Sequence, residues 1–222
     1  MSSNNNQSEI LKMELILALR RAGVTNRAVV STMESIPREI FVPKVFRDRS
    51  YEDITLPIGF HQTLSQPAIV GLMTEALELD DRKKVLEVGT GCGYQAAVLS
   101  RLCRRVYSIE RYRSLLLTTD ARLRELRINN VTTRWGDGIE GWPEQAPFDR
   151  MILTAAASKV PESLLGQMAD DGIIIAPVGE TSRDQTLMKL KHLPSGKWKS
   201  EPLWPVRFVP LLDGKISGTS NL

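Results

Sequence analysis

A short segment near the middle of the chain constrains its fold more than any other. Residues 85–94 read Val-Leu-Glu-Val-Gly-Thr-Gly-Cys-Gly-Tyr, so an apolar run leads into glycines at every second position. Such a pattern is typical of a buried strand followed by a tight turn and a helix, and the glycines let a ligand approach the backbone closely. The segment therefore predicts a strand, turn and helix that hold a nucleotide-like ligand.

Two details indicate which ligand this is. Tyr94 stands where a dinucleotide-binding fingerprint requires its third glycine, which argues against an NAD-dependent dehydrogenase. A second apolar run, 106–109, ends in Glu110, 21 residues after Gly89, where a carboxylate can accept hydrogen bonds from both ribose hydroxyls. The spacing therefore favours S-adenosylmethionine. The residues expected to bind it are Gly89, Thr90, Gly91, Gly93 and Glu110.

A further acidic residue follows the next predicted strand. Gly136-Asp137-Gly138 comes directly after residues 131–135, at the edge where ligands of open parallel sheets collect. A Gly-Asp-Gly sequence is more often an ordinary turn than a ligand site. Its place after this strand leads us to expect that Asp137 accepts the adenine amino group and that Gly138 belongs to the same cofactor site.

Strands and helices alternate from residue 84 onward. This alternation predicts a mostly parallel sheet with helices on both faces. Together with the expected S-adenosylmethionine site, it leads us to expect an α/β Rossmann-like S-adenosylmethionine-dependent methyltransferase fold. Two further runs, 186–191 and 197–203, predict a C-terminal hairpin that turns at 194–196. The sheet strands are expected at 84–88, 106–109, 131–135, 149–154 and 173–176, and the helices at 94–102, 114–126 and 161–168.

The first third of the chain has a different pattern. Helices are expected at 9–22, 25–35 and 67–79, and residues 51–66 are expected to form a loop that enters the third helix at Ser65. We expect a single domain, 1–222. Its parts are a disordered polar tail at 1–8, an N-terminal helical and substrate-loop region at 9–80, a cofactor-binding core at 81–180 and C-terminal strands at 181–222.

Composition and charge limit the kinds of ligand and partner that we expect for this chain. Of the 222 residues 42% are hydrophobic, enough for the core of one domain. The formal net charge of +3 is the difference between 29 basic and 26 acidic residues, so the chain needs no polyanionic partner. No apolar run approaches the ~18 residues of a membrane span, and Cys92 and Cys103 lack metal-ligand spacing. We expect a cytoplasmic monomer that binds no metal, no nucleic acid and no membrane.

Segments spread from about Ile10 to Asp213 resemble one enzyme family, the protein-L-isoaspartate O-methyltransferases. The most specific are 62–67, Gln-Thr-Leu-Ser-Gln-Pro, and 206–211, Val-Arg-Phe-Val-Pro-Leu, whereas the glycine turn is shared by many methyltransferases. The order and spacing of the segments are similar as well. The others are Ile-Pro-Arg-Glu-Ile-Phe-Val-Pro at 36–43, Leu-Pro-Ile-Gly at 56–59, Trp-Gly-Asp-Gly at 135–138, Ala-Ala-Ala at 155–157 and Ala-Pro-Val-Gly at 176–179.

The resemblance implies methyl transfer from S-adenosylmethionine to the free α-carboxylate of isoaspartyl residues in damaged proteins and peptides, which starts repair through a succinimide. Ser65 matches the family's active-site serine, and we expect its hydroxyl to donate to the substrate carboxylate. Gln62, Thr63 and Leu64 are expected to line the same loop, and the backbone around Val209 to receive the peptide as an added strand. A carboxylate with pKa near ~4 needs no general base at neutral pH, so orientation must supply most of the acceleration.

Some positions depart from the common family pattern. Cys92 stands where many relatives have serine, His61 where they often have glycine, and Leu212 where some have a polar residue. These departures leave open how selective the protein is for its acceptor.

An alternative role for Ser65 is to cap the helix that begins near Pro67.

Two other functions stay open at this stage. One is a methyltransferase for a different acceptor, although residues 148–155 lack the Asn-Pro-Pro-Tyr-like segment of enzymes that methylate base amino groups. The other is a non-catalytic member of the fold that binds the cofactor, against which the presence of Ser65, Glu110 and Asp137 argues. Methyl incorporation into different acceptors separates these alternatives.

Overall fold

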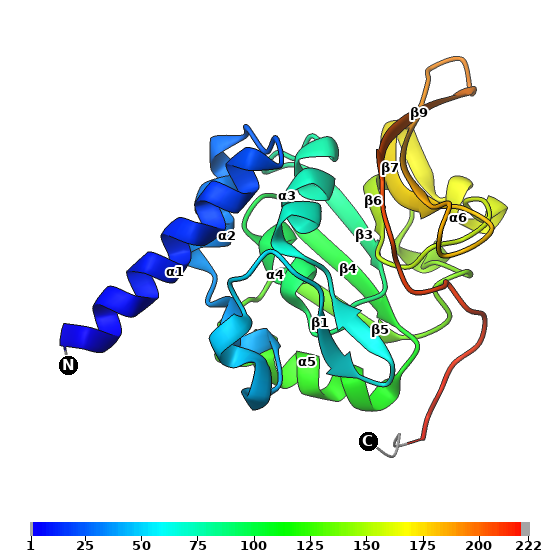
Figure 1. The fold of residues 1–222 in the computed structure, drawn as a ribbon. Helices are drawn as coiled ribbons and strands as arrows, with labels where there is room; N and C mark the ends of the chain where they lie inside the picture. The colour runs from blue at the N-terminus through cyan, green and yellow to red at the C-terminus, as the bar shows by residue number, and fades with distance from the viewer. Residues whose placement is uncertain (1, 219–222) are drawn as a thin grey trace.

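In the computed structural model, which describes residues 2–218, a seven-stranded sheet runs through the centre of the protein (Figure 1). Its strand order is β5-β4-β3-β6-β7-β8-β9, with parallel pairing from β5 to β7 and antiparallel pairing of β8 and β9. The order reverses beside β3, which is where open parallel sheets bind ligands. The strands are β3 (Lys84–Val88), β4 (Arg105–Glu110), β5 (Val131–Trp135), β6 (Phe148–Leu153), β7 (Met168–Val178), β8 (Thr186–His192) and β9 (Trp198–Pro205).

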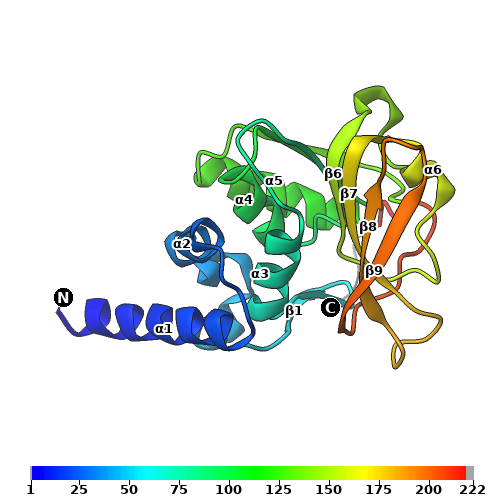
Figure 2. The same ribbon diagram turned by 90° about the horizontal axis from the view of Figure 1, so that it is seen from above.

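Helices cover both faces of the sheet, because alternate residues of each central strand point to opposite sides. Val85 packs with Met73 and Leu99 of two helices on one face, whereas Leu86 packs with Leu164 of a short helix on the other. Figure 2 shows α3, α4 and α5 on one side and α6 on the other. The predicted α/β class is confirmed. The helices are α1 (Ser2–Arg21), α2 (Arg27–Ser35), α3 (Pro67–Ala76), α4 (Tyr94–Ser100), α5 (Arg113–Glu125) and α6 (Glu162–Leu165), with 3-10 helices η1 (Arg38–Phe41), η2 (Lys44–Arg49) and η3 (Pro143–Gln145).

Predicted and observed elements agree best where the pattern is local. Strands β3 and β5 have the expected bounds, and β8 and β9 form the expected antiparallel hairpin. The helix expected at 161–168 is shorter, because Gly166 follows its last residue and β7 already begins at Met168, opposite Phe148.

The segment 51–66 was expected to be a loop, and this expectation was wrong. Strands β1 (Leu56–Gly59) and β2 (Gln62–Leu64) form an antiparallel hairpin with a two-residue turn. Both turn residues, Phe60 and His61, have positive φ angles of 54° and 55°. Such turns usually carry Asn or Gly, so Phe-His gives no hairpin signal in the sequence.

The tail expected at 1–8 also differs from the structure, where α1 begins at Ser2; Met1 lies outside the described residues. The helix is anchored further along by Leu15 and Leu19, which are completely buried. Once such a helix is nucleated, each added residue gains one backbone hydrogen bond, and no Pro or Gly interrupts it between residues 2 and 21.

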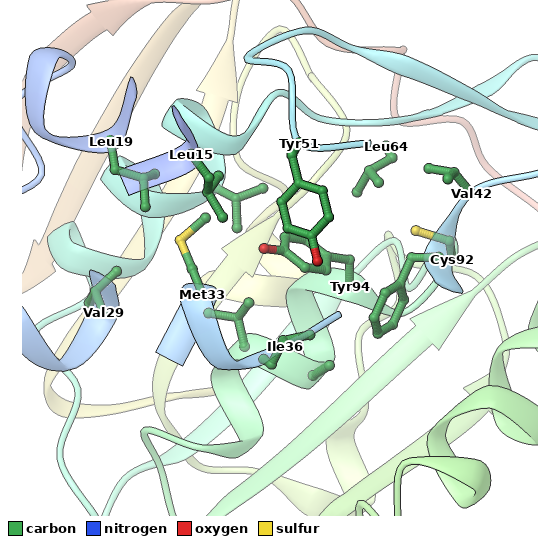
Figure 3. Close-up of a cluster of buried hydrophobic side chains, with 14 of the residues drawn as sticks. Leu15, Leu19, Val29, Met33, Ile36, Val42, Tyr51, Leu64, Cys92 and Tyr94 are labelled. Carbon is green, nitrogen blue, oxygen red and sulfur yellow. The ribbon is translucent and has the colours of Figure 1, made fainter. Parts of the chain in front are cut away.

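The N-terminal helices and the cofactor-binding core share one hydrophobic cluster. Figure 3 shows Leu15, Met33 and Tyr51 of the N-terminal region packed around Tyr94 of α4. Cys92, within the glycine turn, belongs to the same cluster. The region at 9–80 is therefore packed directly onto the turn that the sequence singled out.

Candidate active site

A cavity of about 270 Å³ opens between the carboxyl ends of β3 and β4 and the hairpin β1–β2. The segment that follows β9, residues 208–212, closes another part of its wall. The cavity therefore lies at the carboxyl ends of the parallel strands, beside β3, where the strand order reverses. The predicted site residues that line it are Gln62, Thr63, Leu64, Ser65, Gly89, Thr90, Gly91, Glu110, Gly138 and Val209.

Hydrogen bonds with β4 and with Thr154 fix the glycine turn, residues 89–93. The backbone nitrogens of Gly89 and Thr90 both donate to the carbonyl oxygen of Ile109, at 2.9 and 3.1 Å. Gly89 has a φ of +99°, and a Cβ at this position would collide with the Thr154 hydroxyl oxygen. That hydroxyl in turn donates to the Gly89 carbonyl at 2.7 Å. A glycine is thus required at position 89 for both conformation and space.

Glu110 is oriented by two backbone groups. Its Oε2 accepts from the Gly91 nitrogen at 2.8 Å, and its Oε1 accepts from the Tyr112 nitrogen at 3.0 Å. The residue is 5% exposed, and this burial raises the pKa of its carboxyl group. Each carboxylate oxygen has a second lone pair, so the group can still accept hydrogen bonds from a ligand in the cavity that it lines.

Two predicted cofactor residues lie outside the cavity lining. Gly93 has a φ of +88°, and a Cβ there would lie 2.6 Å from a methyl carbon of Thr119, so it allows α5 to pack closely. Asp137 accepts from the nitrogens of Ile139 and Gly214 at 2.8 and 2.5 Å, which holds its own turn and the C-terminal segment. For these two residues a direct role in cofactor binding stays a prediction.

Ser65 lies between β2 and α3, and its carbonyl accepts from Arg38 Nη2 at 2.6 Å. The first turn of α3 is capped by Asp53, whose Oδ1 accepts from the Ala68 nitrogen at 2.8 Å. Gln66 takes the N-cap position itself. The alternative of Ser65 as helix cap is therefore not what the structure contains, and no hydrogen bond joins its hydroxyl to another residue in the range 2–218.

The backbone around Val209 is already paired within the protein. The Val209 carbonyl accepts from the Ala156 nitrogen at 2.8 Å, and the Leu211 nitrogen donates to the Ala156 carbonyl at 2.6 Å. On the opposite side the Phe208 nitrogen donates to Gln185 Oε1 at 2.6 Å. Binding of a peptide as an added strand at Val209 stays a prediction, with little unpaired backbone to support it.

Sequence reasoning missed a number of the lining residues, among them Thr154, Arg111 and Tyr112. Thr154 follows β6, and the switch-point rule identifies it only once the order of the strands is known. Arg111 and Tyr112 come directly after Glu110, and their place next to a predicted cofactor residue could have indicated them. The Nε and Nη1 atoms of Arg111 are buried without a hydrogen-bond partner among the described residues.

An adenosyl cofactor fits these residues. The carboxylate of Glu110 is fixed at the cavity, and Arg111 offers two unpaired donors beside it. At Gly138, which also lines the cavity, a Cβ would come within 2.5 Å of a Val88 methyl carbon, so a larger residue there would displace Val88. Over the described range, no group of three or more His, Cys, Asp or Glu side chains is placed to hold a metal ion.

Comparisons with known proteins identify the family of this chain. The family described as Protein-L-isoaspartate(D-aspartate) O-methyltransferase (PCMT) matches residues 10–216. The chain is 54% identical over 210 residues to the Protein-L-isoaspartate O-methyltransferase of Parvibaculum lavamentivorans, covering 94% of each chain. It is 52% identical over 202 residues to that of Rhodospirillum centenum, covering 90% of this chain and 91% of the relative.

Solved structures lead to the same family. One described as protein-L-isoaspartate O-methyltransferase has a TM-score of 0.79 at 30% identity, over 93% of this chain and 67% of that one. A putative protein-L-isoaspartate O-methyltransferase from Plasmodium falciparum in complex with S-adenosyl-L-homocysteine has a TM-score of 0.76 at 23% identity, over 89% and 96%, and shares the fold. This chain therefore belongs to the protein-L-isoaspartate(D-aspartate) O-methyltransferase family.

Proposed function

We infer that this protein transfers a methyl group from S-adenosylmethionine to the free α-carboxylate of isoaspartyl residues in damaged proteins and peptides, and so starts their repair through a succinimide. The observation that carries this proposal is one cavity that joins the loop 62–65 to the glycine turn and to Glu110. Donor and acceptor sites for a methyl transfer thus share one space. Membership of the family supports the same reaction.

On the cofactor side, we propose that the backbone of Gly89, Thr90 and Gly91 and the carboxylate of Glu110 hold the ligand. Glu110 accepts from the ribose hydroxyls, and its two internal hydrogen bonds keep it in place before the ligand arrives. The bound cofactor supplies an electrophilic methyl group on a positively charged sulfur. The chain's own contribution is to fix that group in the cavity and to exclude water around it.

On the acceptor side, we propose that the Ser65 hydroxyl donates to the α-carboxylate of the isoaspartyl residue and fixes its direction. The carboxylate is ionised at neutral pH, so no proton has to be removed before it attacks. Alignment of the two reacting groups can contribute on the order of 7 to 11 kcal/mol in favourable systems. Ser65 acts here as a hydrogen-bond donor and forms no covalent bond to the substrate.

We also propose that the protein works as a cytoplasmic monomer on isoaspartyl proteins and peptides, without a nucleic-acid partner. Two buried free cysteines, Cys92 and Cys103, suit a reducing compartment. The nearly balanced charge gives no reason to expect binding to a polyanion. In the range 2–218, none of the helices has the length and apolar character needed to cross a bilayer.

Methyl incorporation from labelled S-adenosylmethionine into four acceptors tests this proposal. An isoaspartyl peptide, the matching aspartyl peptide, RNA and DNA are assayed side by side. We expect transfer to the isoaspartyl peptide and background counts in the other three. Preference for another acceptor rejects the assignment, and binding of S-adenosylhomocysteine without transfer to any acceptor favours the non-catalytic alternative.

A further inference from the structure

Arg38 is a buried cation that the proposed reaction does not yet use. It opens the 3-10 helix η1, in the segment Ile-Pro-Arg-Glu-Ile-Phe-Val-Pro, and its side chain is completely buried. Among residues 2–218 it forms no ion pair with a carboxylate, and its Nη1 has no hydrogen-bond partner. Burying an arginine without a counter-charge is costly, so its contacts call for an explanation.

Arg38 joins two distant segments through their carbonyl groups. Its Nε donates to the Ser50 carbonyl at 2.8 Å, and its Nη2 donates to the Ser65 carbonyl at 2.6 Å. The planar guanidinium fixes both directions at once, because its donors form a rigid fork. This hydrogen bond to the Ser65 carbonyl fixes the backbone of that residue, and with it the position of the Cβ that carries the hydroxyl.

The guanidinium also lies one side chain behind the wall of the cavity. Its central carbon is 4.5 Å from the centre of the Tyr94 ring, and Tyr94 lines the cavity. Phe41 packs edge-on against the same ring, with the ring centres 5.2 Å apart. Figure 3 shows Tyr51 beside Tyr94, and Leu64 and Ile36 belong to the same hydrophobic cluster. The charge of Arg38 is thus shielded from water and close to the part of the cavity that Ser65 lines.

The neighbouring acid does not neutralise this charge. Glu39 accepts a hydrogen bond from the Tyr51 hydroxyl at 2.6 Å, so its carboxylate is turned to the tyrosine. Charges that are shielded from water act more strongly on a nearby ion than charges at the surface do. An anion in the cavity beside Ser65 therefore experiences a net attraction toward Arg38.

We propose that Arg38 is a positioning residue for the methyl acceptor, which aims Ser65 through its carbonyl and favours an anionic acceptor through its unpaired charge. This rests on the proposed function, because it takes the isoaspartyl carboxylate to bind beside Ser65. Arg38 does not line the cavity itself, and its hydrogen bonds go to Ser50 and Ser65 and not to the glycine turn. Its effect should therefore appear in acceptor kinetics and leave cofactor affinity unchanged.

Arg150 of β6 provides a matched control. It is also buried, with 8% exposure, and it also donates to backbone carbonyls, those of Leu77 at 2.5 Å and Asp149 at 2.8 Å. It does not line the cavity. The test compares R38K and R38M with R150K and R150M. For each variant we measure thermal stability, the affinity for S-adenosylhomocysteine by calorimetry, and kcat and KM for the isoaspartyl peptide.

The lysine and methionine variants separate the two roles of Arg38. R38K keeps the charge but lacks the fork, so we expect kcat to fall ~10-fold with KM within ~3-fold of the wild type. R38M also loses the charge, and we expect KM to rise a further ~10-fold. Both Arg150 variants should lose stability and keep kcat and KM within ~3-fold of the wild type. S-adenosylhomocysteine affinity should change by less than ~3-fold throughout.

Equal changes in kcat and KM for the Arg38 and Arg150 pairs would overturn the proposal and make Arg38 a purely structural residue. So would a loss of S-adenosylhomocysteine affinity in R38K as large as its loss of turnover. If R38M does not fold, the comparison of R38K with R150K decides the point. A wild type that leaves the isoaspartyl peptide unmethylated rejects the proposed function itself, whereas an active wild type with indistinguishable arginine pairs rejects only the role of Arg38.

Discussion

The two walls of the cavity are built in different ways. The cofactor wall, residues 84–110, consists of neighbouring parallel strands, and backbone hydrogen bonds from β4 hold its glycine turn. The acceptor wall, residues 36–66, consists of two 3-10 helices and a short hairpin, and single side chains fix it: Arg38 donates to the Ser65 carbonyl, and Asp53 accepts from the first turn of α3. Many backbone hydrogen bonds therefore fix the cofactor wall, whereas the acceptor wall depends on a few side-chain hydrogen bonds. Changes in the cofactor wall should therefore affect folding and ligand binding strongly, and changes in the acceptor wall should affect mainly transfer.

The largest expected effect is on the free energy of unfolding, and a Gly→Ala substitution in each wall tests it. Gly89 and Gly59 have similar φ angles, +99° and +93°, but a Cβ collides with Thr154 only at Gly89, with nothing within 4 Å at Gly59. We expect Gly59→Ala to cost about 1 to 2 kcal/mol of backbone strain. Gly89→Ala adds overpacking and should cost about 3 to 5 kcal/mol in all. Urea unfolding of the two variants checks this, and equal losses would contradict the difference between the walls.

The next effect concerns cofactor affinity. Glu110→Ala removes a carboxylate that is held in place by Gly91 and Tyr112, and we expect S-adenosylhomocysteine to bind about 100-fold more weakly. Asp137→Asn is the comparison, because Asp137 does not line the cavity whereas Glu110 does. Its effect should be smaller. Calorimetry that gives unchanged affinity for Glu110→Ala would remove the ribose role from this residue.

A third effect is a pH dependence confined to the cofactor wall. Glu87 of β3 is completely buried, and this raises the pKa of its carboxyl group from 4.5 to about 8; the Ser108 hydroxyl, which donates to it, offsets part of the rise. Between these values the folded state holds a proton that the unfolded state has lost. Stability should therefore fall as pH rises through this window, by up to about 1.4 kcal/mol per pH unit.

Glu87→Gln tests this dependence because glutamine mimics the protonated acid. The difference in unfolding free energy between wild type and variant, measured in urea from pH 5 to 8, should shift in favour of the variant as pH rises. Ser65→Ala in the acceptor wall is the control and should leave the slope of the wild type unchanged, since it neither adds nor removes a titratable group. A pH-independent difference between wild type and Glu87→Gln would show that Glu87 does not titrate on unfolding.

The same contrast decides what the sequence could predict. In the cofactor wall each feature is local: an apolar run, a glycine turn and an acid at the end of the next run place Gly89 and Glu110 without knowledge of the rest. Strand β3 accordingly lies at its predicted bounds, 84–88. Thr154 joins this wall from β6, and only the order of strands, a property of the whole sheet, brings it there.

The acceptor wall was harder to predict because its restraints come from far along the chain. Arg38 and Asp53 act on residues 27 and 15 positions away, and no sequence period marks such pairs. The hairpin turn at Phe60 and His61 carries neither of the residues that usually permit a positive φ. For this wall the family resemblance identified Ser65 and its segment, whereas the contacts of Arg38 and Asp53 became known only from the structure.

The smallest effect, Ser65→Ala, tests whether the acceptor wall acts on transfer alone. The Ser65 hydroxyl makes no hydrogen bond within the described residues, and the cap of α3 is provided by Asp53. Its removal should therefore leave both stability and S-adenosylhomocysteine affinity nearly unchanged. We expect kcat for the isoaspartyl peptide to fall about tenfold, the equivalent of one modest hydrogen bond to a charged acceptor.

Ser65→Thr completes this test because it keeps the hydroxyl while adding a methyl group. Turnover in Ser65→Thr that lies above that of Ser65→Ala assigns the lost rate to the hydrogen bond, since a purely steric role would make threonine the worse replacement. Turnover in Ser65→Ala equal to the wild type would remove Ser65 from the mechanism. A fall in cofactor affinity as large as the fall in kcat would instead show that the two walls respond as one unit.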